Sequence, residues 1–141
     1  MRKKILFPLL MLIIFLFVAD AQAGGQKTTV INAVDGNTLL VKRDRKLIKV
    51  RLWGIEAPEL SQPYGREAKA RLMALCRNQK VTVYLKNGSG KSAYEVYMEK
   101  GFRLNLNSEM VKKGYARATV GKYKSVEGLA RKNKRGLWAK K

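Results

Sequence analysis

Apolar and polar residues alternate along several short segments of this chain, and this alternation predicts β-strands. Residues 28–34 and 38–42 flank the sequence Asp-Gly-Asn at 35–37, which favours a tight reversal, so the two segments predict a hairpin. Residues 81–86 and 93–98 alternate in the same way and predict two further strands. The pattern therefore indicates a domain built largely from short antiparallel strands.

A further predicted strand, residues 47–53, carries a basic residue on the face opposite its aliphatic residues. Ile48, Val50 and Leu52 alternate with polar or aromatic residues, so their side chains point to one face of the strand. Arg51 then points to the opposite face. We expect this guanidinium to be available to a ligand.

Helical spacing replaces alternation in the other segments. Residues 65–77 carry apolar residues on one helical face. Residues 107–113 and 125–134 predict two more helices, which end near Gly114 and Gly136, glycine being common just after a helix. Strands followed by helices in this order predict a small β-barrel with helical decoration.

The N-terminus has the pattern of an export signal. Basic residues at 2–4 precede an apolar run at 5–18, and small residues follow at 21–23. The alternative is a membrane anchor, but the run is shorter than the ~20 residues that a spanning helix needs. We therefore expect cleavage after Ala23 and a periplasmic or secreted domain over residues 24–141, with no stable membrane insertion afterwards.

Composition excludes several classes of enzyme. The 141 residues include no histidine, which excludes mechanisms that use imidazole as a base or metal ligand. The single cysteine, Cys76, excludes an internal disulfide and a cysteine-rich zinc site, and we expect it to be a buried apolar residue. With 46% hydrophobic residues, the chain should fold around one core.

The charge balance indicates a polyanionic partner. Lys and Arg number 30 against 10 Asp and Glu, a formal net charge of +20, which attracts nucleic acid, anionic lipid or acidic polymers. A solvated basic surface without a partner is the alternative. Tyr115 and Tyr123, close in sequence to Lys122 and Lys124, predict a surface on which bases stack, although these aromatics could equally belong to the core or its rim.

A short segment carries residues suited to phosphodiester chemistry. Arg51, Glu56 and Glu59 lie at the end of a predicted strand and on the proline-containing loop after it. Phosphodiester hydrolysis needs positive charge on the phosphate and a carboxylate that orients or deprotonates water. By spacing alone, a plain surface loop remains the alternative.

The order of motifs resembles the thermonuclease, or staphylococcal-nuclease-like, family. Residues 34–38 (VDGNT) and 50–59 (VRLWGIEAPE) resemble its V-D-G-D-T and R-L-x-G-I-D-x-P-E motifs. Residues 64–68 (YGREA), 107–116 (NSEMVKKGYA) and 136–138 (GLW) resemble its helix and tail motifs. The resemblance implies an α+β fold, an OB-fold five-stranded β-barrel with three α-helices, over nearly all of residues 24–141.

The resemblance also implies calcium-dependent hydrolysis of DNA and RNA. In the family, two arginines bind the phosphate and a glutamate handles the water, and Arg51 and Glu59 match the first arginine and the glutamate. Lys91 stands where the second arginine is expected. Lysine keeps the charge but cannot bind a phosphate through two parallel hydrogen bonds, so we expect weaker stabilisation of the transition state.

The metal positions depart further from the family pattern. Asn37 replaces the first metal-binding aspartate and keeps an oxygen without the charge, while Glu56 replaces the second with a longer carboxylate. Ala57 replaces a threonine but retains a backbone carbonyl, and Asp35 lies on the same turn as Asn37. The resemblance implies Ca²⁺ as the cation, with Mg²⁺ or Mn²⁺ as alternatives.

Two functions follow from these departures. Either the site is a retuned metal-dependent nuclease, or catalysis has decayed and a basic module remains that binds nucleic acid or other polyanions without a metal. Binding to anionic surfaces is a third alternative. No heptad pattern or apolar stripe predicts an oligomer, so we expect a monomer.

Overall fold

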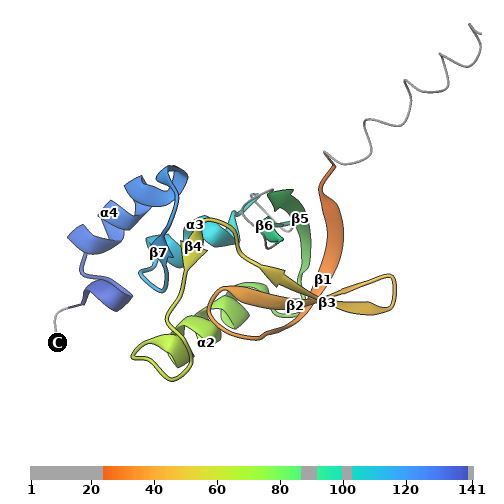
Figure 1. The fold of residues 1–141 in the computed structure, drawn as a ribbon, viewed down its shortest axis with the longest axis horizontal. Helices are drawn as coiled ribbons and strands as arrows, with labels where there is room; N and C mark the ends of the chain where they lie inside the picture. The colour runs from red at the N-terminus through yellow and green to blue at the C-terminus, as the bar shows by residue number, and fades with distance from the viewer. Residues whose placement is uncertain (1–23, 87–91, 100–102, 140–141) are drawn as a thin grey trace, which may run out of the picture.

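The computed structural model describes residues 24–86, 92–99 and 103–139. Five antiparallel strands form the main sheet, and three helices pack beside it (Figure 1). The strands are β1 (Gln26–Ala33), β2 (Thr38–Arg43), β3 (Lys46–Arg51), β5 (Lys80–Lys86) and β6 (Ala93–Met98), and the helices are α2 (Gly65–Cys76), α3 (Leu106–Lys112) and α4 (Lys124–Lys132). The predicted α+β class, with five strands and three helices, is confirmed.

The sheet is open, in the order β3-β2-β1-β5-β6. Its edge strands β3 and β6 come close to one another, and beyond the end of β3 Leu52 forms an isolated bridge with Tyr94 and the Trp53 N–H donates to the Tyr94 carbonyl at 2.8 Å. A single bridge does not extend into a ladder, so the sheet is not closed into the expected barrel. This contact nevertheless fixes the segment that follows Arg51.

A second, two-stranded sheet was not predicted. Here β4 (Ile55–Glu56) pairs antiparallel with β7 (Arg117–Ala118), so that Glu56 lies opposite Arg117. Short 3₁₀ turns, η1 (Gly121–Tyr123) and η2 (Gly136–Trp138), flank α4. The β4–β7 pair joins the loop of candidate catalytic residues to the C-terminal part of the chain.

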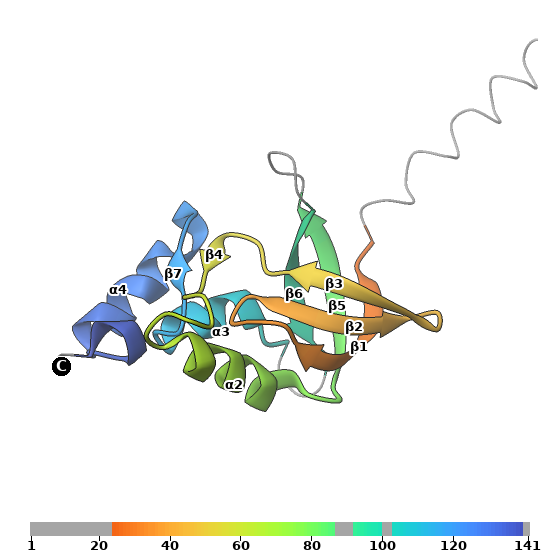
Figure 2. The same cartoon turned by 60° about the horizontal axis from the view of Figure 1, so that its bottom comes forward.

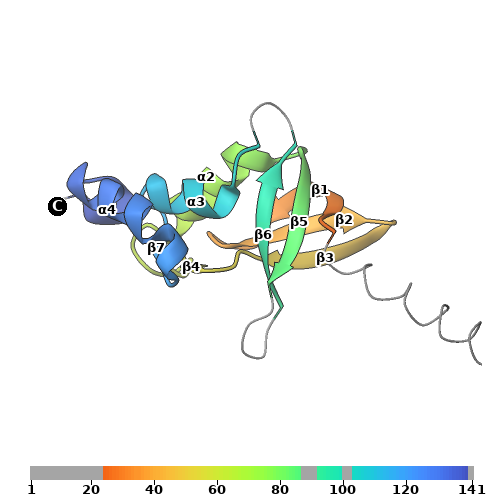
Figure 3. The ribbon, with the colours of Figure 1, turned by 90° about the horizontal axis from the view of Figure 1, so that it is seen from above.

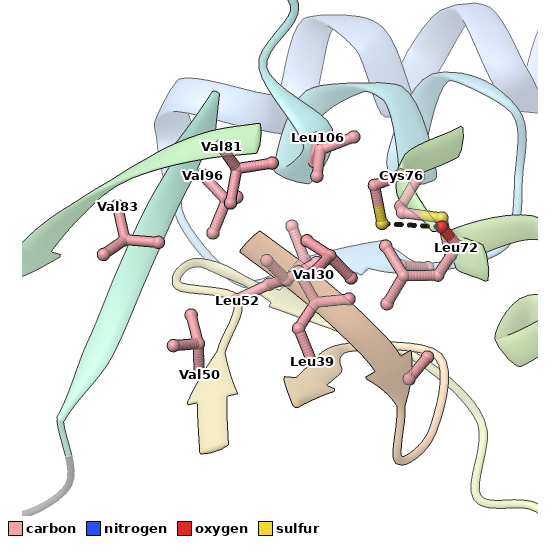
Figure 4. Packing of buried hydrophobic residues seen from close by; sticks show 14 of the residues in the cluster. Val30, Leu39, Val50, Leu52, Leu72, Cys76, Val81, Val83, Val96 and Leu106 are labelled. Carbon is pink, nitrogen blue, oxygen red and sulfur yellow. Dashed lines mark hydrogen bonds between the residues drawn. The ribbon is translucent and has the colours of Figure 1, made fainter. Parts of the chain in front are cut away.

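The core lies between the sheet and the helices, and Figure 4 shows its aliphatic residues converging from both. Val50 and Leu52 are buried while Arg51 is exposed, which confirms the predicted alternation. Cys76 is fully buried, as expected, and lies 3.0 Å from the Leu72 carbonyl. Burial raises the pKa of the Cys76 thiol to about 12, so it stays protonated at neutral pH.

The helices lie at one end of the main sheet, with α4 farthest from it (Figure 3). Helix α2 packs against β1, and α3 contacts α2, α4 and β6. Within the described ranges, no helix combines the length and apolar character needed to cross a membrane. The predicted export signal, residues 1–23, lies outside the described residues.

Candidate active site

Three segments meet at a cleft of about 480 Å³. They are the β1–β2 turn, the end of β3 and the segment that links β4 to α2, which curls beside the start of α2 in Figure 2. The cleft is lined by every described residue for which a catalytic or metal-binding role was predicted: Asp35, Asn37, Arg51, Glu56, Ala57 and Glu59. Lys91 lies outside the described residues.

Hydrogen bonds fix the β1–β2 turn at the cleft wall. Asp35 Oδ1 accepts from the Asn37 N–H at 2.9 Å, and the Asn37 carbonyl accepts from the Leu52 N–H at 2.8 Å. The Asn37 side chain is 7% exposed, and its Nδ2 donates to the Ile55 carbonyl at 3.4 Å, a long bond. Asn37 thus ties the turn to both the end of β3 and the start of β4.

Gly36 lets this turn approach the neighbouring segments closely. A Cβ at this position would lie 2.6 Å from the Ala68 Cβ and 2.7 Å from the Ala57 Cβ. Neither methyl group can rotate away, so a larger residue would separate the turn from α2 and from the segment that follows β4. The small side chains at these three positions allow the cleft to form.

The backbone of Glu59 is held by a compact turn. Its N–H donates to Gln62 Oε1 at 2.8 Å, and its carbonyl accepts from the Gln62 N–H at 2.9 Å. A Cβ on Gly65 would lie only 1.8 Å from the Glu59 carbonyl oxygen, so only glycine allows the helix to begin so close to this turn. The Glu59 side chain itself is exposed and lines the cleft.

The donor atoms around the cleft are oxygens, the ligand type that hard divalent cations prefer. Glu56 supplies a carboxylate, Asn37 an amide oxygen and Ala57 a backbone carbonyl, while one Asp35 oxygen is already bonded to the Asn37 N–H. Within residues 24–86, 92–99 and 103–139, no three acidic or cysteine side chains come close enough together to hold a metal ion. The donor set fits a hard cation in chemical type but is poor in carboxylates.

The predicted base-stacking residues are mostly engaged elsewhere. Tyr123 is only 2% exposed, and its ring packs edge-on against Trp53 with centroids 6.1 Å apart, so it is a core residue and the stacking role is corrected. Lys124 Nζ donates to the Ala118 carbonyl at 2.7 Å. Tyr115 is half-buried against the core. The sequence left open whether these aromatics form a stacking surface or belong to the core and its rim, and the second alternative is the one observed.

Sequence reasoning missed a buried carboxylate on β6. Glu95 is 4% exposed and contacts Lys122, Lys86 (3.1 Å) and the Tyr123 hydroxyl, which donates at 2.8 Å. Burial alone would raise the pKa of Glu95, but these three hydrogen bonds outweigh it and hold the pKa below its ordinary value. The hydrogen bond that Lys122 donates to Glu95 also raises the pKa of Lys122. Nothing in the strand pattern distinguished Glu95 from a solvated residue.

Asn107 is a second missed residue, although it opens one of the family-like motifs. It is fully buried, and its side chain makes three hydrogen bonds. The amide oxygen accepts from the Val96 N–H at 3.0 Å, and the amide nitrogen donates to the Trp53 and Tyr94 carbonyls at 2.9 Å each. Asn107 therefore joins α3 to β6 and to the segment that follows Arg51.

Comparisons with known proteins identify relatives of this chain. Residues 49–140 match the family described as Staphylococcal nuclease homologue. An uncharacterized endonuclease of Escherichia coli O157:H7 is 33% identical over 147 residues, covering 99% of this chain and 91% of its own length. A thermonuclease of Staphylococcus hyicus is 30% identical over 137 residues, covering 84% of this chain and 79% of its own length.

This chain belongs to the staphylococcal nuclease family. The match confirms the resemblance inferred from the motifs, and a micrococcal nuclease of Shigella flexneri, 32% identical over 125 residues, is similar over 78% of this chain and 72% of its own length. Relatives named as nucleases support an endonuclease function and a nucleic-acid substrate.

Proposed function

We propose that this protein is an exported, metal-dependent endonuclease that hydrolyses phosphodiester bonds of DNA or RNA. The observation that carries the proposal is the convergence of Arg51, Glu56 and Glu59 on one cleft from separate segments. A positive charge for the phosphate and a carboxylate for the water are the two requirements of this chemistry, and both face the same space.

Each cleft residue has a distinct role in this proposal. Arg51 binds the scissile phosphate through its guanidinium and stabilises the charge that develops on the oxygens. Glu59 orients the attacking water and accepts its proton, helped by the hydrogen bonds that fix its backbone. Lys91, by its place in the family motif, adds a second positive charge on the phosphate.

A hard cation would be held by Glu56, Asn37 and the Ala57 carbonyl, with Asp35 nearby, and would supply positive charge at the phosphate. Ca²⁺ is the proposed ion because it accepts neutral oxygen ligands and flexible geometry, with Mg²⁺ and Mn²⁺ as alternatives. The neutral Asn37 amide lowers the charge of this donor set, so we expect weak affinity for the cation.

Cleavage of single-stranded DNA and RNA tests the proposal. Turnover should require an added divalent cation, disappear with a chelator and fall by at least about 100-fold in Glu59→Gln, as expected for loss of a general base. Glu67→Gln, which removes an exposed carboxylate from α2, is the matched control and should leave turnover unchanged. Equal turnover in the two variants would exclude the role of Glu59.

A second candidate function is nucleic-acid binding without catalysis. It is favoured by the neutral Asn37 amide at a position where the family pattern has a metal-binding aspartate and by the net charge of +20. Binding would then weaken steeply with salt and be indifferent to chelators. Absence of cleavage with Ca²⁺, Mg²⁺ and Mn²⁺, together with salt-sensitive binding, would favour this function over hydrolysis.

Export and the monomeric state are proposals that rest on the sequence. The apolar run at 5–18 and the small residues before Gly24 support removal of residues 1–23. Mass spectrometry of the protein outside the cytoplasm should then find a chain that begins at Gly24, whereas an intact Met1 in the membrane fraction would indicate an anchor. Light scattering of the purified protein should give the mass of one chain.

A further inference from the structure

A second cavity, of about 570 Å³, adjoins the cleft and shares part of its wall. Both cavities are lined by the segment from Glu56 to Glu59, so a ligand that crosses this segment reaches both. The second cavity is also lined by Arg117, Tyr64 and Leu137. It thus offers a cation and an aromatic ring directly beside the candidate catalytic residues.

Arg117 is held in place by the C-terminal part of the chain. It lies on β7 opposite Glu56, and its guanidinium carbon is 4.6 Å from the centroid of the Trp138 ring. Arg131 contacts the same ring at 3.7 Å, so two guanidinium groups share one indole. Stacking of this kind restricts an arginine while leaving its hydrogen-bond donors available.

The two arginines differ in their counter-charges. Arg131 forms an ion pair with the buried Glu127 at 2.8 Å. Arg117 is exposed and lines the cavity, and no carboxylate of the described residues lies within 4.0 Å of its guanidinium. Glu56 and Glu59 line the same cavity but form no ion pair with Arg117, so an anion bound at the guanidinium would meet hydrogen-bond donors that no described carboxylate occupies.

Tyr64 faces the same cavity from a conformation that a bulky residue rarely adopts. Its φ is +67°, in the left-handed region, and as the N-cap of α2 it makes no side-chain capping bond. Such backbone strain occurs preferentially at functional sites. The ring lies with the apolar side chains of Pro63 and Leu137 on the cavity wall, a surface suited to the face of a base.

We propose that this cavity is a nucleotide subsite, in which Arg117 binds a phosphodiester that flanks the scissile one and Tyr64 stacks on the neighbouring base. The inference rests on the proposed function, because it takes the same polynucleotide as ligand. The occupant is single-stranded, since a base within a duplex does not expose its face to a side chain. The subsite extends the substrate path past the Glu56–Glu59 segment.

Binding of fluorescein-labelled dT12 to the protein, measured by anisotropy with a chelator present, tests Arg117 without turnover. Arg117→Gln should weaken binding about tenfold and reduce the slope of log K against log salt by about 0.7, the value for one phosphate contact on a single strand. Arg117→Lys should retain most of the slope. Arg77→Gln, which removes an exposed charge after α2, should leave the slope unchanged. Identical slopes in Arg117→Gln and Arg77→Gln would overturn the proposal.

A second variant, Tyr64→Gly, separates stacking from folding. Glycine adopts the left-handed region without the steric penalty of a Cβ, which offsets part of the loss of the half-buried ring, so this variant should remain folded in thermal denaturation. Its affinity for dT12 should fall at least about fivefold, as expected for loss of one stacked base. Unchanged affinity in a stable Tyr64→Gly variant would show that the ring does not contact the ligand.

The same variants distinguish this proposal from the proposed hydrolysis. If the wild type cleaves nothing but Arg117→Gln still loses one phosphate contact, the hydrolase proposal fails and the subsite stands. If the wild type cleaves dT12 and Arg117→Gln binds like Arg77→Gln, the subsite fails and the hydrolase proposal stands.

Discussion

Asn107 offers a quantitative test of how the catalytic end of the sheet is held. The side chain is fully buried, and its three hydrogen bonds reach Val96, Trp53 and Tyr94 on two other segments. In Asn107→Ala all three bonds are lost. The Tyr94 carbonyl keeps a bond from the Trp53 N–H, whereas the Val96 N–H loses its Asn107 partner at a buried position.

The size of the effect follows from these contacts. At about 1 kcal/mol for each hydrogen bond, the loss is about 3 kcal/mol, and an unsatisfied buried N–H raises it toward about 4 kcal/mol. At about 4 °C per kcal/mol for a domain of this size, the melting temperature should fall by about 12 to 16 °C. Asn107→Asp should be at least as destabilising, because it sets an oxygen against both the Trp53 and Tyr94 carbonyls.

Urea denaturation followed by circular dichroism measures the free energy of unfolding of each variant. Asn133→Ala is the matched control, because its side chain also bonds one carbonyl, that of Leu129 at 2.8 Å, but in an exposed position. We expect a loss below about 0.5 kcal/mol there. A loss below about 1 kcal/mol in Asn107→Ala would refute the reasoning, since it would mean that the three buried bonds contribute almost nothing.

Three further predictions concern the cleft and its surroundings. Gly65→Ala should lower turnover by about 100-fold, because its Cβ displaces the turn that holds Glu59, the proposed catalytic carboxylate. Gly121→Ala, where a Cβ meets no atom within 4 Å, should be neutral in the same cleavage assay. Asn37→Asp should tighten Ca²⁺ binding about tenfold in isothermal titration by adding a charged ligand, and equal tightening in Asn133→Asp would contradict this. The buried Glu127 carboxylate has a lowered pKa, because hydrogen bonds from the Ala118 N–H and Arg131 outweigh its burial. The contribution of Glu127 to the free energy of unfolding is therefore complete above pH 4.5 and is lost as the pH falls through the lower pKa of the folded state. The melting temperature of Glu127→Gln should consequently fall less steeply with acid pH than that of the wild type.

The sequence predicted the regular elements well because local pattern determines them. The alternation around Val50 and Leu52 placed Arg51 on the exposed face, and helical spacing placed Cys76 in the core. The candidate cleft residues were also found, because the family resemblance fixed their positions and the structure brings Asn37 and Glu59 to one cleft. Their convergence depends on segments that are close in sequence.

Features that depend on distant segments were not predicted. The pairing of Glu56 with Arg117 joins residues far apart in the chain, and no local pattern marks a strand of two residues. The same reason hides Glu95, whose partner Lys122 comes from a turn after α3, and explains why the sequence left open whether Tyr123 lies on the surface or in the core. Local alternation cannot distinguish a charge that faces water from one that a later segment covers.

The β4–β7 pair also makes the site late to assemble during synthesis. The segment that carries Glu56 is held by Arg117 and Ala118, and Ala118 is held in turn by Glu127 on α4. A ribosome-bound chain that ends before β7 lacks both contacts, although its β1–β3 hairpins are complete, and a chain that ends before α4 still lacks the hydrogen bond between Ala118 and Glu127. A growing chain therefore carries Arg51 well before the supports of the Glu56–Glu59 segment exist, and the candidate cleft stays incomplete until nearly the whole chain has been made.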